Sequence, residues 1–95
     1  MQNVNINQDM DAAAMSALKP MFEDLAAGVD DISLDLAGVG FMDSSGIGGI
    51  VFLYKRLRER SLDLTLANVT GQPLRLMAQL QLSFLIATNP DDVAA

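Results

Sequence analysis

The chain has 95 residues, which is enough for one domain, and its hydrophobic fraction of 51% lets that domain bury a core without disulfides. It has no cysteine and no histidine, so disulfides and thiolate metal sites are excluded and the commonest general base is missing. Six Lys and Arg residues against twelve Asp and Glu residues give a net charge of −6, which argues against nucleic acid as a partner.

Strand and helix patterns alternate along the chain. In chain order they predict a strand over 2–7, a helix from near Ser16 to Gly28, a strand over 32–36, a helix over 45–60, a strand over 62–67, a helix over 73–82 and a strand over 84–87. Such alternation predicts an α/β fold with a mostly parallel sheet.

Two ends of these elements depend on single residues or short segments. Pro20 fits only the first turn of a helix, so the regular part of the first helix is expected to begin near Ser16 rather than Ala12. Residues 88–95 are expected to form a frayed tail.

The first residues do not form a signal peptide and no apolar run is long enough to span a membrane. We therefore expect a cytoplasmic protein with no direct membrane insertion.

The glycine-rich segment 38–49 joins a strand to a helix, which is the place of a phosphate-binding loop in several nucleotide-binding folds. A P-loop needs Lys and then Ser or Thr after its last glycine, but Ile50 and Val51 follow Gly49. The dinucleotide-binding motif G-x-G-x-x-G is absent, because Gly38 and Gly40 are followed by Asp43 where the third glycine is needed. A nucleophile elbow with a catalytic triad is also excluded, because the chain has no histidine. We therefore expect no enzymatic activity, no cofactor and no metal.

Two interpretations of Asp43, Ser44 and Ser45 stay open on local grounds. One of these side chains can cap the following helix by accepting hydrogen bonds from its first N–H groups. That role leaves a hydroxyl unexplained, and two adjacent serines at a helix start are also suited to phosphorylation.

The second helix has a predicted core side and a predicted outer side. At 100° per residue, the core side carries Ile47, Ile50, Val51, Leu53, Tyr54 and Leu57. The opposite side carries Ser45, Gly48, Gly49, Phe52 and Arg56. A flat surface of small residues beside one aromatic residue favours a docking face over plain close packing of the glycines. The cations Lys55, Arg56, Arg58 and Arg60 favour a solvated helix end over an anion site.

Residues 35–48, Asp-Leu-Ala-Gly-Val-Gly-Phe-Met-Asp-Ser-Ser-Gly-Ile-Gly, strongly resemble the STAS family of bacterial anti-sigma-factor antagonists. The resemblance continues through 64–69 into 80–84 and covers about residues 4–86. It implies one STAS domain over residues 1–95, with a core over about 4–86 and a tail over 88–95. The implied sheet has four or five strands, mostly parallel or mixed, with helices mainly on one face.

The resemblance also implies a phosphorylation switch. Ser44 is the expected acceptor, with Ser45 as the alternate, and the expected partners are an anti-sigma factor with serine kinase activity and a phosphatase. The predicted partner-binding residues are Asp43, Ser44, Ser45, Gly46, Gly48, Gly49, Phe52 and Arg56. Alternatives from the same family are a subunit of a membrane lipid-transport ATPase and a stress-sensing scaffold, and a small-ligand carrier ranks third.

The N-terminal segment departs from the family pattern. The family usually has two strands before its first helix, but only one Asn-rich stretch over residues 2–7 is present here. An open sheet edge would follow, and such an edge can pair with a second copy of the chain. A homodimer is therefore among the expected partners.

Overall fold

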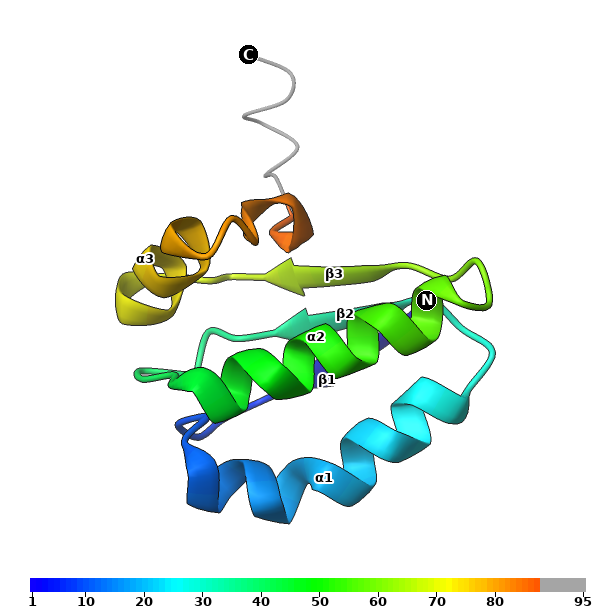
Figure 1. Ribbon diagram of the computed structural model, residues 1–95, viewed down its shortest axis with the longest axis horizontal. Coiled ribbons are helices and arrows are strands. Elements are labelled where there is room, and N and C mark those ends of the chain that lie inside the picture. Colours follow the sequence, from blue (N-terminus) through cyan, green and yellow to red (C-terminus); the bar gives the residue numbers. More distant parts are fainter. Residues whose placement is uncertain (88–95) are drawn as a thin grey trace.

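Strands and helices alternate along the chain in the predicted order as far as α3 (Figure 1). The computed structural model describes residues 1–87. Its elements are β1 (Gln2–Asn5), α1 (Ala12–Ala27), β2 (Ile32–Asp35), α2 (Ser44–Arg58), β3 (Leu64–Ala67), α3 (Gly71–Gln79) and the short 3-10 helix η1 (Ser83–Leu85). The predicted tail over 88–95 lies outside the described residues.

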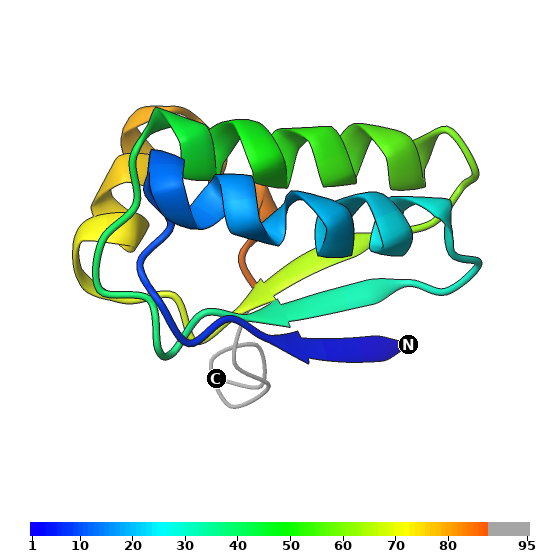
Figure 2. The same cartoon turned by 90° about the horizontal axis from the view of Figure 1, so that it is seen from below.

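The sheet has the order β1-β2-β3 and is parallel at both pairings. Helices α1 and α2 lie side by side over one of its faces, and α3 lies beyond the end of β3 (Figures 1 and 2). The α/β class and the placement of helices mainly on one face are therefore confirmed. The predicted four or five strands are too many, because residues 1–87 form three, and no antiparallel pairing mixes with the parallel ones in this part of the chain.

The strand predicted over 84–87 is replaced by η1. The N–H of Leu82 donates to the carbonyl of Met77 at 2.8 Å, and this tight turn carries the chain straight from α3 into η1. Only the last residues become extended, where Ile86 forms a single parallel bridge to Leu66. Leu85 is buried and Phe84 is exposed. The apolar run is therefore a packed turn rather than a fourth strand.

Alternation along the strands divides the sheet into an apolar and a polar face. Ile32, Leu34, Leu64 and Leu66 are buried under α1 and α2. The intervening positions of the three strands carry small and polar side chains, namely Asn3, Asn5, Ser33, Asp35, Thr65 and Ala67. Full burial of each large aliphatic side chain contributes about 1.5–3 kcal/mol, so the core between the sheet and the two helices dominates stability.

Helix α1 begins earlier than predicted. Its N-cap is Asp11, whose carboxylate accepts a hydrogen bond from the N–H of Ala14 at 2.9 Å. Pro20 lies inside the helix, on its exposed side. The expectation of a start near Ser16 is therefore wrong. Packing of Met15, Phe22 and Leu25 against the core holds α1 together, although Pro20 has no N–H to donate.

The other helix boundaries differ from prediction by two or three residues at most. Helix α2 begins one residue earlier than predicted, and α3 begins at Gly71, with Pro73 as its third residue. No helix within residues 1–87 is both long and apolar enough to cross the hydrocarbon core of a bilayer.

Candidate functional site

The start of α2 is capped by Asp43. Its carboxylate accepts hydrogen bonds from the N–H groups of Ser45 at 2.8 Å and Gly46 at 3.3 Å. The capping interpretation is therefore correct for Asp43, and it leaves both serine hydroxyls without a structural task. Across residues 1–87, no hydrogen bond uses the hydroxyl of Ser44 or Ser45. Ser44 is exposed and Ser45 is half-buried.

The loop before α2 is held against the loop that leads into α1. The N–H of Met10 donates to the carbonyl of Phe41 at 2.9 Å, and the N–H of Asp43 donates to the carbonyl of Met10 at 3.3 Å. The carboxylate of Asp9 also accepts from the N–H of Phe41 at 3.1 Å. These bonds fix the backbone directly in front of Ser44.

A glutamine from α3 holds the same loop from the other side. The side-chain amide of Gln72 accepts a hydrogen bond from the N–H of Met42 and donates one to the backbone carbonyl of Met42, each at 2.8 Å. Met42 is fully buried, so Gln72 pairs both backbone groups of a residue that water does not reach. Gln72 could not be predicted as part of this site, because a glutamine in the first turn of a helix carries no signal for a partner 30 residues away.

The same loop begins with a turn at the end of β2. The carboxylate of Asp35 accepts a hydrogen bond from the N–H of Ala37 at 2.9 Å. This bond, together with a smaller contribution from the side chain of Asn68, lowers the pKa of Asp35 below its ordinary value. The ionised carboxylate therefore stabilises the turn that leads towards Ser44.

The three glycines of α2 have different surroundings. A Cβ on Gly46 would lie 2.6 Å from the carbonyl oxygen of Met10, so this buried position requires glycine. A Cβ on Gly49 would collide with the end of the Met15 side chain, whereas one on Gly48 would meet open space. The prediction that Gly48 and Gly49 both face outward is therefore wrong for Gly49. Close packing accounts for Gly46 and Gly49.

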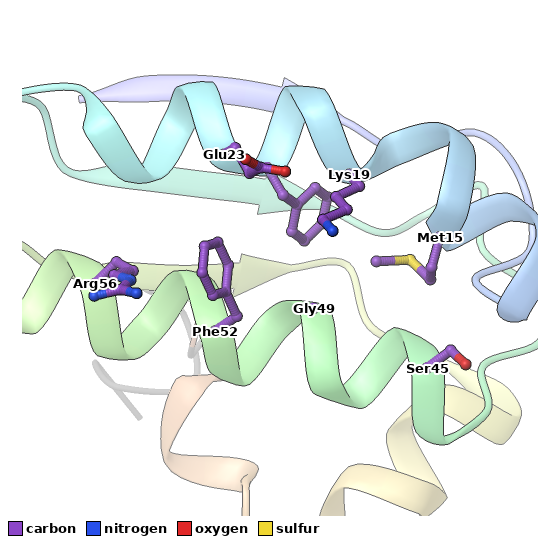
Figure 3. Close-up of a pocket in the computed structure, with 8 residues that line it drawn as sticks. Met15, Lys19, Glu23, Ser45, Gly49, Phe52 and Arg56 are labelled. Carbon is purple, nitrogen blue, oxygen red and sulfur yellow. The ribbon is translucent and has the colours of Figure 1, made fainter.

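The predicted outer side of α2 faces α1 over most of its length. Ser45, Gly49 and Phe52 line a groove of about 460 Å³ between the two helices, with Arg56 at one end (Figure 3). Phe52 is 37% exposed, and the guanidinium of Arg56 lies 5.5 Å from the centre of its ring. Gly48, one turn after Ser44, is exposed, and a Cβ at this position would meet open space.

The helical phase predicted for the core side is correct only in part. Ile50, Leu53 and Leu57 are fully buried against the sheet, whereas Val51 and Tyr54 are only half-buried. The prediction assumes that α2 has one buried side and one exposed side, but α2 contacts the sheet, α1 and η1. Its buried surface is therefore wider and turned towards α1.

The cations at the end of α2 have structural partners. Arg58 pairs with Asp63 at 2.9 Å, and Arg60 donates to the carbonyl of Ala27 at 3.0 Å, where it caps the end of α1. Arg56 pairs with Glu59 at 3.5 Å. These contacts favour the interpretation of a solvated helix end over an anion site. No cluster of three or more acidic side chains suited to a metal ion occurs among residues 1–87.

Comparisons with known proteins give one family model that matches the chain and several solved structures that share its fold. The STAS domain family model matches residues 3–95. A candidate anti-sigma factor antagonist from Thermotoga maritima has a similar structure, with a TM-score of 0.80 and 20% identity over 97% of this chain and 84% of that one.

Two further solved structures share the fold. One is a sulfate transporter family protein from Wolinella succinogenes, with a TM-score of 0.75 and 14% identity over 95% of this chain and 78% of that one. The other is the anti-sigma factor antagonist SpoIIAA in its unphosphorylated form, with a TM-score of 0.71 and 17% identity over 97% of this chain and 83% of that one. No curated protein sequence matches the chain.

Proposed function

Since the chain belongs to the STAS domain family, we propose that it is an anti-sigma factor antagonist whose binding is switched by phosphorylation of Ser44. In its unphosphorylated form it binds an anti-sigma factor that is also a serine kinase, and so frees a sigma factor for transcription. The phosphorylated form releases this partner, and a phosphatase restores the first state. Two of the structural neighbours are described as anti-sigma factor antagonists, which supports this choice within the family.

The observation that carries the proposal is the position of Ser44. It is the first residue of α2, it is exposed, and its hydroxyl has no partner within residues 1–87. A kinase must reach the hydroxyl from solvent, which Ser44 allows. Ser45 is half-buried and lines the groove towards α1, so it is the less accessible of the two.

The fold tolerates a phosphate at Ser44 because none of the surrounding backbone has to move. Asp43 already accepts from the N–H groups of Ser45 and Gly46, so the phosphate finds its hydrogen bonds in water instead. Repulsion from the carboxylate of Asp43 is screened there. The loop remains held by Gln72 and Met10.

The partner does not tolerate the phosphate equally well. Phosphorylation adds about −1.5 to −2 charges, which must lose water when the surface docks. A like charge across an interface costs several kcal/mol, so release follows without a large conformational change. The chain itself catalyses nothing in this scheme, and the partner supplies the nucleotide site. Both proteins act in the cytoplasm.

The binding surface is proposed to extend from the start of α2 along its exposed side. Ser44, Gly48 and the exposed edge of Phe52 form its accessible part. Asp43 and Gly46 shape the backbone beneath it. Arg56, stacked on Phe52, lies at its far end.

The experiment is phosphorylation by the anti-sigma kinase of the same organism with ATP, followed by mapping of the modified residue by mass spectrometry. We expect modification of the wild type and of Ser45→Ala at Ser44, and no modification of Ser44→Ala. Modification of Ser45 alone would shift the assignment by one residue. No modification at either serine, with stable binding to a membrane ATPase instead, would contradict the proposal and favour a constitutive scaffold.

A further inference from the structure

The groove between α1 and α2 has apolar walls on both sides. Met15 and Phe22 line it from α1, and Phe52 lines it from α2 (Figure 3). Gly49 lets the end of Met15 pack directly on the backbone of α2, because a Cβ at this position would collide with Met15 and contact Phe22 at 3.5 Å. Its volume of about 460 Å³ lies in the range of about 300–1,000 Å³ that is typical of small-molecule sites.

The charges at the rim of this groove differ from those of the chain as a whole. Lys19 and Arg56 line it together with a single carboxylate, Glu23, whereas the whole chain carries a net charge of −6. Lys19 extends from α1 towards α2 (Figure 3), and it forms no ion pair with any other residue of the described part of the chain. Arg56 pairs with Glu59 through an exposed contact at 3.5 Å, which a ligand can replace at little loss.

These features together select the chemistry of an occupant. An apolar or aromatic body fits between Met15, Phe22 and Phe52, and ring pairs of this kind are favourable beyond their buried area. An anionic head at the Lys19 end of the groove gains from this ammonium, which has no ion pair among residues 1–87, whereas a cationic head there would face a like charge.

We propose that the groove between α1 and α2 binds small amphiphilic carboxylates, with the apolar body between Met15 and Phe52 and the carboxylate beside Lys19. The site does not depend on phosphorylation of Ser44. It does share Phe52 and Arg56 with the proposed partner surface.

The probe for this site is 4-phenylbutyrate, and its binding to the full chain is monitored by NMR. We expect saturable shifts of the Met15 methyl and the Gly49 amide at concentrations up to about 10 mM, the range of weak single-site binding. The neutral analogue 4-phenyl-1-butanol and the cation 4-phenylbutylamine should bind more weakly. Shifts confined to other parts of the chain, or no saturable shift, would overturn the proposal.

Two matched pairs of variants separate the site from general effects. Lys19→Gln should weaken 4-phenylbutyrate about three- to five-fold, the scale of a partly exposed ion pair, whereas Lys55→Gln on the outer side of α2 should not. Gly49→Ala moves Met15 into the groove and should weaken binding, whereas Gly48→Ala meets open space and should not. If Gly49→Ala does not fold, the lysine pair decides. Equal affinity for Lys19→Gln and Lys55→Gln would refute the charged part of the site.

Discussion

Replacing Gln72 with alanine removes both hydrogen bonds between α3 and the loop that precedes Ser44. The two bonds are 2.8 Å long, and their partner Met42 is fully buried, so its N–H and carbonyl would lose their partners in the interior. An unpaired buried group costs about 1–3 kcal/mol, and water that enters beside the smaller side chain recovers part of this. We expect Gln72→Ala to lower the free energy of unfolding by about 2–3 kcal/mol.

Urea unfolding measures this loss, with Gln79→Ala as the matched control because Gln79 is an exposed glutamine on the same helix. A domain of this size should also unfold about 4–8 °C lower for each kcal/mol lost. Gln72→Glu keeps the acceptor for the N–H of Met42 but sets a carboxylate oxygen against the Met42 carbonyl, so it should also be less stable than Gln79→Ala. If Gln72→Ala and Gln79→Ala agree within about 0.5 kcal/mol, the usual range of surface substitutions, the reasoning about this loop is refuted.

Three further predictions concern other parts of the molecule. Pro20→Ala restores an N–H in the middle of α1 and should raise the free energy of unfolding by about 1–3 kcal/mol in urea, and a loss of stability would contradict this. Because the pKa of Asp35 is lowered in the folded state, Asp35→Asn should be less stable than wild type at pH 7, and the difference should shrink progressively as the pH falls through about 4 and below, where the carboxylate becomes protonated; a difference that stays constant from pH 7 down to about pH 2 would exclude this cause. Phe52→Ala should weaken partner binding by about 2 kcal/mol, the scale of an interface hot spot, while Phe84→Ala on η1 should not, and calorimetric titration distinguishes the two.

Elements that depend on local patterns could be predicted from the sequence. Alternation of Leu64 and Leu66 with polar residues predicts a strand with one buried face, and a cap within residues 43–45 follows from their place before a helical pattern, whereas only the structure assigns that cap to Asp43. The apolar segment 84–87 could not be assigned from its composition. Its conformation depends on the turn that Leu82 forms with Met77 after α3.

Features that depend on contacts between distant segments could not be predicted. The periodicity of α2 gives the positions of Gly49 and Phe52 relative to each other, but only the packing of α1 shows that they line a groove. The same is true of Gln72, whose partner Met42 lies in another loop. The exposure of Ser44 agrees with its predicted place at the start of α2, whereas its phosphorylation remains a proposal.

The most direct test of the proposed switch compares two forms of the same chain, unmodified and phosphorylated at Ser44. Calorimetric titration of each form with the anti-sigma factor measures the two dissociation constants, and thermal unfolding of each form reports whether the fold is retained. We predict affinity at least about 100-fold lower for the phosphorylated form, equivalent to about 2.7 kcal/mol, with an unchanged unfolding temperature. Equal affinities, or loss of binding only because the phosphorylated chain unfolds, would contradict the account.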